Sequence, residues 1–520
     1  MAGGLMQLVS YGAQDIYISG NPQITFWKIL YKRHTNFAVE SIEVTFNGQA
    51  DFNKRVTAVI NRNADLMYKT YVQVVLPAVD LTQTAIDGSI GASAGFRWLN
   101  YIGHRLIKQV ELEIGGQRID RQYGDWMQIW TQLATEAGNV HVLDSMVGNT
   151  HDLVLMKRKT ALPLDTTCSA SETTISCLPR AGTPAKTLYI PLQFWFCRNP
   201  GVAIPLIALQ YHEVRINVDF ETWQNCQYYE RTIGNPQAAN AQSLAAASLY
   251  IDYVYLDTEE RRRFAQQSHE YLIEQVQYTG AESITSSSNK IQLNFNHPVK
   301  ELQWVVQRDS FVDCSTSTWL ASIGGAQPFN YSDDFSTDGI IVSLLSQSSG
   351  AATGGTVPSQ ATMNLGQGAT EFTSMVGADT YDLSGVQEFE SGVNYLLAKV
   401  ILASGIRCEG KNPVEVAKLQ LNGQDRFTER EGSYFDKVQP YQHHSRSPST
   451  GINVYSFALR PEEHQPSGSC NFSRIDKATL QLTVSLNTVT GSRTAQVRVY
   501  ALNYNVLRVM SGMGGLAYSN

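Results

Sequence analysis

Residues 3–46 read GGLMQLVSYGAQDIYISGNPQITFWKILYKRHTNFAVESIEVTF and combine an irregular half with a regular half. Up to Pro22, glycine and proline recur too often for a helix or strand to continue through them. From Phe37 to Phe46, apolar and polar residues alternate as in a half-buried strand. An irregular stretch that is rich in Leu, Ile, Tyr and Phe must lie against its own domain or a partner. The segment therefore predicts an N-terminal arm, residues 1–26, that leads into a β-domain.

The composition of the chain is that of a globular β-protein. Its 520 residues exceed the ~250–300 at which single cores stop growing, so two or more domains are expected. The 39 Gly, 25 Tyr and 19 Phe favour strands and turns over helices. The net charge of −7 argues against sequence-independent binding of nucleic acid, which needs a basic surface.

Cysteine usage and hydropathy predict where such a protein is made. The seven Cys are odd in number and no pair has C-x-x-C spacing, so neither a disulfide framework nor a zinc site is expected. No basic stretch followed by an apolar one marks a signal peptide. The most apolar windows are interrupted well short of the ~18–20 residues that span a bilayer. We expect a soluble protein from a reducing compartment that does not cross a membrane.

Short strands separated by turns follow one another along the chain. Two helices interrupt them: Gly124–Thr135, with apolar residues at i, i+3, i+4 and i+7, and a helix capped by Asp257 or Thr258 that ends near Gln267. A polar, Ala-rich stretch at 224–248 precedes the strand that begins at Leu249. Strands are predicted over Arg55–Val59, Tyr68–Leu76, Ile107–Ile114, Leu188–Phe196, Tyr211–Phe220, Leu249–Leu256, Ile273–Tyr278, Ile291–Phe295, Leu302–Gln307, Ala478–Leu486 and Ala495–Asn503.

One strand-and-turn pattern occurs twice. VELEIGGQ at 110–117 matches AKLQLNGQ at 417–424 in period and in turn, and each is followed by another glycine, Gly124 or Gly432, beside aromatic residues. Two such units fit sandwiches better than propeller blades, which repeat every ~40–50 residues. We predict a mainly β protein with two tandem eight-stranded antiparallel jelly-roll β-sandwiches, a few short helices and long loops. The predicted domains are the arm at 1–26, a first jelly roll at 27–256, a linker helix at 257–268 and a second jelly roll at 269–520, with a long loop at 315–390.

Several blocks of the sequence together carry a resemblance to a known family. The blocks are YGAQDIYISGNPQITF followed by YKRHTNF in the arm, QFWFCRNPGVAIPLIALQYHEVRI (193–216), VYLDTEERRRFAQ (254–266), LNGQDRF (421–427), YSFALRPEEHQPSGSCNFSRID (455–476) and NYNVLRVMSGMGGLAYSN (503–520). In these blocks the chain resembles the double jelly-roll major capsid proteins of large nucleocytoplasmic DNA viruses. The resemblance fades over roughly 80–100, 137–187 and 309–405 but reaches both termini.

Two motifs of enzymes occur in unsuitable surroundings. Gly91–Gly95 fits G-x-S-x-G, but Ser93 lies in a small-residue linker and not at a strand-to-helix turn. Gly405–Lys411 resembles the start of a phosphate-binding loop. Asn412, however, replaces the Ser or Thr that would hold Mg²⁺, and no alternation of strands and helices surrounds it.

Histidines and acidic residues near the C-terminal end also suggest no chemistry. His443, His444 and His464 have no third ligand at strand or helix spacing, so we interpret them as loop histidines. The pair Glu462-Glu463 lies beside Arg460, which predicts a salt bridge within a turn. We therefore predict no catalytic residue, no cofactor-binding residue, no metal ligand and no cofactor, and expect that the protein is not an enzyme.

Two functions of different classes remain. One is a structural major capsid protein, and the other is a double β-sandwich carbohydrate-binding (lectin-like) protein, since lectins share jelly rolls. A cupin-type enzyme is disfavoured because the metal ligands are missing. The apolar arm and the Gly-rich apolar tail Val509–Leu516 favour a subunit that assembles.

The family resemblance implies the details of that assembly. Three copies would form a pseudo-hexameric capsomer, and capsomers would tile the icosahedral shell of a large double-stranded DNA virus. The arm would lie on the inner side, meeting minor capsid proteins near an internal membrane that the chain does not span. The loops at 82–95 and 315–390 would face outward. We expect a virion protein, assembled in the host cytoplasm, that does not bind nucleic acid directly.

Overall fold

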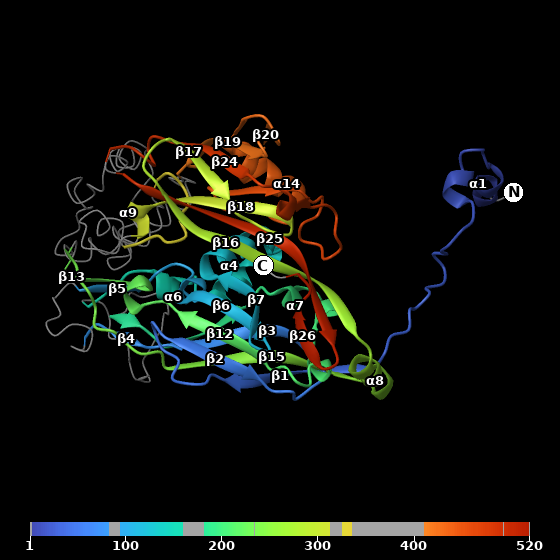
Figure 1. Ribbon diagram of the computed structural model, residues 1–520, viewed down its shortest axis with the longest axis horizontal. Coiled ribbons are helices and arrows are strands. Elements are labelled where there is room, and N and C mark those ends of the chain that lie inside the picture. The colour runs from blue at the N-terminus through green and yellow to red at the C-terminus, as the bar shows by residue number, and fades with distance from the viewer. Residues whose placement is uncertain are drawn as a thin grey trace.

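The computed structural model describes residues 3–82, 94–159, 181–232, 235–312, 325–334, 410–491 and 493–518. Strands dominate this part of the chain, in two antiparallel sandwiches that lie side by side (Figure 1). Ser93, residues 405–409 and most of the predicted loop at 315–390 lie outside the described residues.

The first sandwich is built from residues 37–256. One sheet has the strand order β1-β15-β3-β10, with the short β11 also paired to β3, and the facing sheet has the order β2-β12-β6-β7. Four strands in each sheet, with chain-distant neighbours, make an eight-stranded jelly roll. The bounds are β1 Phe37–Thr45, β2 Arg55–Ile60, β3 Leu66–Leu76, β6 Ile107–Ile114, β7 Gln117–Tyr123, β10 Lys186–Pro191, β11 Ile204–Pro205, β12 Val214–Phe220 and β15 Ala246–Leu256.

The second sandwich repeats this order. One sheet runs β16-β25-β18-β22, with β23 paired to β18 and β26 paired to β25; the other runs β17-β24-β19-β20, with β21 paired to β19. Its strands are β16 His269–Ile284, β17 Ser288–Leu293, β18 Pro298–Arg308, β19 Val414–Leu421, β20 Gln424–Asp425, β21 Arg430–Glu431, β22 Ile452–Ser456, β23 Cys470–Asn471, β24 Ala478–Val484, β25 Ala495–Met510 and β26 Met513–Leu516. The predicted fold class is confirmed.

Short elements connect and cover the sheets. The α-helices are α1 Gly3–Val9, α2 Ile16–Ser19, α3 Ile102–Leu106, α4 Gly124–Ala134, α5 Val140–Val147, α6 His151–Val154, α7 Trp195–Arg198, α8 Thr258–Gln266, α9 Asp309–Val312 and α14 Gln439–His443, the last preceded by a π-helical turn at Tyr434–Val438. The remaining strands are β4 Val79–Asp80, β5 Gly95–Trp98, β8 Lys157–Arg158, β9 Gly182–Thr183, β13 Gln227–Thr232 and β14 Asn235–Pro236.

The buried side chains lie at the positions that the alternation of apolar and polar residues predicted. On β12, Val214, Ile216, Val218 and Phe220 are buried while Arg215 is exposed. The helix α4 has the predicted start, and Asp257 caps α8 by accepting a hydrogen bond from the backbone N–H of Thr258 at 2.8 Å. Apolar burial of this kind is the main favourable term in folding.

The repeated pattern has the same conformation in both sandwiches. Gly116 and Gly423, which close the two hairpins, have φ of +81° and +80°. A Cβ added at Gly124 would lie 2.2 Å from the carbonyl oxygen of Ile107, the first residue of β6. A Cβ at Gly432 would lie 1.8 Å from the carbonyl oxygen of Val414, the first residue of β19. The chain therefore passes close to the start of the same strand in both copies.

Two local predictions are wrong. The strand predicted at 188–196 ends at Pro191, and Trp195–Arg198 is the helix α7, because Pro191 cannot donate a ladder hydrogen bond. The polar, Ala-rich stretch at 224–248, for which no element was predicted, contains β13 and β14. The arm contains the helices α1 and α2: Gly3 and Gly4 begin α1, Gly20 follows α2, and Gly12 lies between the two helices, so no glycine falls beyond the first turn of either helix.

The C-terminal tail packs within the subunit. Beyond β25 it turns back as β26 and reaches the first sandwich, where the backbone N–H of Tyr211 donates to the carbonyl oxygen of Gly512 at 3.0 Å. His212 Nδ1 lies 2.9 Å from the carbonyl oxygen of Gly514. The strand predicted from Tyr211 begins at Val214, although the carbonyl oxygen of Glu213 still accepts a hydrogen bond from the backbone N–H of Gly115 at 2.9 Å. The tail thus packs partly within the subunit, while Met510 and Met513 stay exposed, and its role in assembly remains a prediction.

Candidate assembly surfaces and the seam between the jelly rolls

The arm is the most exposed apolar part of the described chain. Neither α1 nor α2 buries a residue, and the arm extends away from both sandwiches (Figure 1). The exposed fraction is 95% for Trp27, 91% for Leu30 and 87% for Phe26. Solvated side chains of this size in one stretch mark an interaction surface.

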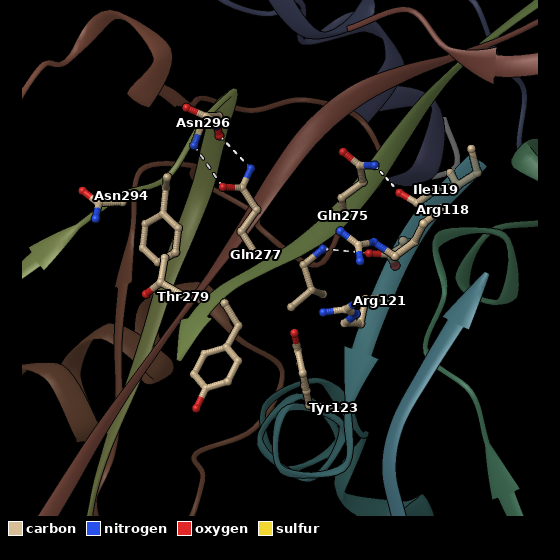
Figure 2. Close-up of a pocket in the computed structure, with 13 residues that line it drawn as sticks. Arg118, Ile119, Arg121, Tyr123, Gln275, Gln277, Thr279, Asn294 and Asn296 are labelled. Atoms are coloured by element: carbon tan, nitrogen blue, oxygen red, sulfur yellow. Dashed lines mark hydrogen bonds between the residues drawn. The ribbon is translucent and has the colours of Figure 1, made fainter. Parts of the chain in front are cut away.

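The seam, the contact of β7 and α4 with the second sandwich, joins the two jelly rolls. In Figure 2, Gln275 of β16 reaches β7, where its amide nitrogen donates to the carbonyl oxygen of Ile119. The backbone N–H of Val276 donates to Asp120 Oδ1 at 3.0 Å. Burial raises the pKa of Asp120 to about 6, more than these hydrogen bonds lower it. The two sheets thus meet through buried polar groups as well as apolar ones.

A small pocket opens along the seam. It has a volume of about 200 Å³, below the ~300 Å³ at which ligand sites usually begin. Figure 2 shows a reciprocal pair of hydrogen bonds between Gln277 and Asn296 on one side, at 2.8 and 2.9 Å. Arg121 on the other side pairs with Glu111 at 2.5 Å, so its guanidinium already has an acidic partner. We assign no ligand to this pocket.

A buried ion cluster spans the seam. Glu274 of β16 pairs with Lys300 of β18 at 2.6 Å and with Arg198 of α7, in the first sandwich, at 2.9 Å. The Lys300 side chain is 0% exposed and that of Glu274 is 5% exposed. Burial alone would raise the pKa of Glu274, but Arg198 and Lys300 outweigh it and the pKa is lowered. Arg198 also stacks on Trp130 of α4, with the guanidinium carbon 4.7 Å from the ring centroid.

A second ion cluster surrounds His444, immediately after α14. Its Nε2 lies 2.9 Å from Glu301 of β18 and its Nδ1 lies 2.9 Å from Glu462, so both ring nitrogens face carboxylates. Burial would lower the pKa of His444, but the two carboxylates outweigh it and raise the pKa to about 9. The ring also contacts Trp130, with centroids 6.4 Å apart. The imidazolium therefore holds two acidic side chains at the seam.

The residues that we considered as candidates for chemistry lie at separate places in the structure. His444 lies in a loop after α14, as interpreted, but its side chain is buried and ion-paired with Glu301 and Glu462, which the sequence did not predict. Arg460 and Glu463 form the predicted turn salt bridge at 3.0 Å, whereas Glu462 does not join it. Lys411 ends the segment that resembles a phosphate-binding loop. Its backbone N–H donates to Asp333 Oδ1 at 2.6 Å, which ties Lys411 to the segment 325–334.

Other predictions concern metals, thiols and membranes. Among the described residues, no group of three or more His, Cys, Asp or Glu could hold a metal ion. Among the described cysteines, Cys197, Cys226 and Cys470 form no disulfide, and burial raises the pKa of the Cys197 thiol to about 12. In the described part of the chain, no helix is long and apolar enough to cross a membrane.

Comparisons with known proteins cover nearly the whole chain. A family model described as the N-terminus of a major capsid protein matches residues 25–257, and one described as the large eukaryotic DNA virus major capsid protein matches residues 260–515. The major capsid protein of Phaeocystis pouchetii virus is 57% identical, and that of Chrysochromulina ericina virus is 51% identical, each over 100% of both chains. The major capsid protein of Paramecium bursaria Chlorella virus 1 is 38% identical over 100% of both chains.

Solved structures have the same architecture. A chain of the quasi-atomic PBCV-1 capsid aligns with a TM-score of 0.62 at 31% identity, covering 95% of this chain and 100% of that one. The Faustovirus major capsid protein aligns with a TM-score of 0.63 at 13% identity over 98% of this chain and 96% of that one, which supports the fold alone. The sugar-binding alternative finds no support in these matches.

Proposed function

The chain belongs to the major capsid proteins of large eukaryotic DNA viruses, and we propose that it acts as a homotrimer whose capsomers tile an icosahedral shell. It is a structural protein of the virion capsid. The observation that carries the trimer is the duplication of the jelly roll: each sandwich has the same strand order, and the two lie side by side (Figure 1).

The geometry of a shell favours three copies. A near-hexagonal plate needs six similar lateral faces, and closed symmetric contacts keep each plate finite. One chain has two jelly rolls, so three chains supply six and two chains would supply only four. The seam is rich in buried ion pairs, which hold the two rolls of a chain together. A plate assembled from such chains keeps its shape when neighbouring plates press against it.

We extend the proposal to the partners of the subunit. Residues 1–26 act as an arm that contacts minor capsid proteins on the inner side, near an internal membrane that the chain does not span. The loops at 82–95 and 315–390 face outward. The chain divides into jelly rolls at 27–256 and 269–520, on either side of a linker helix at 257–268. The protein is not an enzyme, does not bind nucleic acid directly, and assembles in the host cytoplasm.

Light scattering on the purified protein tests the trimer. We expect a mass of about 173 kDa, three times the 57.7 kDa of one chain. The mass should persist at micromolar concentration, because obligate interfaces bury over ~2,000 Å² each. A stable monomer of 57.7 kDa at that concentration would contradict the proposal.

A further inference from the structure

The part of the arm nearest to β1 has an unusual side-chain pattern. We call residues 24–34, ITFWKILYKRH, the basic aromatic segment. Its cations are Lys28, Lys32 and Arg33, and no Asp or Glu occurs anywhere from residue 16 to residue 39. All eleven residues are exposed. Its large apolar side chains and their exposed fractions are Ile24 74%, Phe26 87%, Trp27 95%, Ile29 71%, Leu30 91% and Tyr31 81%.

The segment makes only local contacts. Trp27 donates its backbone N–H to Thr25 Oγ1 at 3.4 Å, and the ring of His34 lies edge-on to Phe37 at 6.2 Å. In Figure 1 this part of the chain runs outward from β1, away from both jelly rolls. Six large apolar side chains therefore face water in the isolated subunit, which is the exposure expected of a docking surface.

The charge of the segment limits what can cover it. The segment carries three cations in a chain of net charge −7, so it is attracted to acidic surfaces. A second copy of this chain is acidic overall, but a copy would also need an apolar surface to seat six large side chains. Within the described part of the body, exposed large apolar side chains stand singly or in small groups, such as Phe37 with Val39 on β1, or Tyr211 beside Met510 and Met513. No such group on the described body is as large as the six side chains of the segment.

A lipid bilayer satisfies both requirements without a matching groove. Trp and Tyr prefer the boundary between headgroups and acyl chains, where an apolar ring and a polar tip are both accommodated. Each Lys or Arg close to an anionic leaflet adds binding energy, and aliphatic side chains insert below the headgroups. An exposed stretch that alternates aromatic and basic residues, without a carboxylate, meets these conditions.

We propose that residues 24–34 bind the surface of a bilayer that contains anionic phospholipid. Trp27 and Tyr31 sit at the interface, Phe26 and Leu30 enter the acyl region, and the cations contact phosphate groups. The segment lies on the membrane and does not cross it. This contact goes beyond the assembly role and does not depend on it, because a subunit that forms no shell can still bind a vesicle.

Vesicle flotation with the full-length purified protein tests the proposal. Liposomes of phosphatidylcholine with about one third phosphatidylserine are compared with liposomes of phosphatidylcholine alone, at ~0.15 M salt and at ~1 M salt, where the screening length falls from about 8 Å to about 3 Å. We expect binding to the anionic vesicles at the lower salt concentration, with large losses on neutral vesicles and at the higher salt concentration.

Three variants separate the contributions. Neutralising the cations in K28Q/K32Q/R33Q should weaken binding about 100-fold, or about five-fold for each charge. W27S/L30S should weaken it at least ten-fold by removing inserted side chains. Tyr441→Ala is the matched control, because Tyr441 is 82% exposed but lies on the body, and it should bind like the wild type. None of these side chains supports the core, so the melting temperature should not change.

Several results would overturn the proposal. These are the absence of flotation with anionic vesicles, equal binding to neutral vesicles, and unchanged binding by both arm variants. If the wild type fails to float while K28Q/K32Q/R33Q or W27S/L30S lowers the mass measured by light scattering, the segment docks on a second copy of this chain instead. Loss of the trimer mass in the wild type would count against the proposed capsomer but not against lipid binding.

Discussion

Replacing Glu274 by Gln should destabilise the subunit far more than the same change four residues earlier on the same strand. Glu274 holds Lys300 at 2.6 Å and Arg198 at 2.9 Å in the seam. The Lys300 side chain is 0% exposed, so water cannot solvate its ammonium group when the carboxylate is removed. The Gln variant would leave two cations in one buried site.

The expected magnitude follows from burial. Removing one partner of a buried ion pair costs about 3–5 kcal/mol because the remaining charge is uncompensated. For a unit of about 250 residues, 1 kcal/mol lowers the melting temperature by about 2–4 °C, so a loss of at least about 6 °C is expected. The control is Glu270→Gln: Glu270 pairs with Arg508 at 2.8 Å, but the two side chains are 57% and 50% exposed. Such exposed pairs contribute at most about 1 kcal/mol.

Differential scanning calorimetry and urea unfolding of both variants, at equal trimer concentration, make the comparison. A double variant E274Q/K300M should cost less than the sum of E274Q and K300M, by about 0.5–3 kcal/mol, because the two residues share one interaction. If E274Q and E270Q shift the melting temperature equally, or if the single effects add, the buried cluster does not hold the seam and this reasoning is wrong.

Three further outcomes are expected. His444 has a pKa of about 9 in the folded state against 6.5 unperturbed. Its contribution to the free energy of unfolding is therefore complete below about pH 6.5 and is lost as the pH rises through about 9. Unfolding measured between about pH 6 and 10 should show this loss of stability in the wild type and not in His444→Gln. Deleting residues 1–24 should leave a folded β-protein by circular dichroism that builds no shells in an assembly assay, since α1 and α2 bury no residue, and an unfolded product would mean that the arm belongs to the core. Gly432→Ala should lower the free energy of unfolding by more than about 2 kcal/mol, because its Cβ would lie 1.8 Å from a backbone oxygen. Gly138→Ala is the control and should be nearly neutral, because no atom lies within 4 Å of the added Cβ. Equal unfolding free energies for the two variants would contradict the close approach at Gly432.

The sequence by itself determined the elements whose pattern is local. The strand at Ile107–Ile114 was predicted with the bounds that the structure has, because alternation and the following glycine pair lie within one stretch of chain. The start of α4 and the cap of α8 were also readable, since a helix cap depends on neighbouring residues. The repeat at 110–117 and 417–424 predicted two similar units, and the matching turns at Gly116 and Gly423 agree with it.

Only the tertiary structure decided the roles that depend on distant partners. The sequence did not predict the ion pairs of His444, because Glu301, which helps to raise its pKa, lies on β18 more than a hundred positions earlier. Nor did it predict where the tail packs, because its partner, His212, is 302 positions away from Gly514. Periodicity reports which face of an element is apolar, but it carries no information on which distant element covers that face. Contacts across the seam between the two jelly rolls therefore had to come from the folded chain.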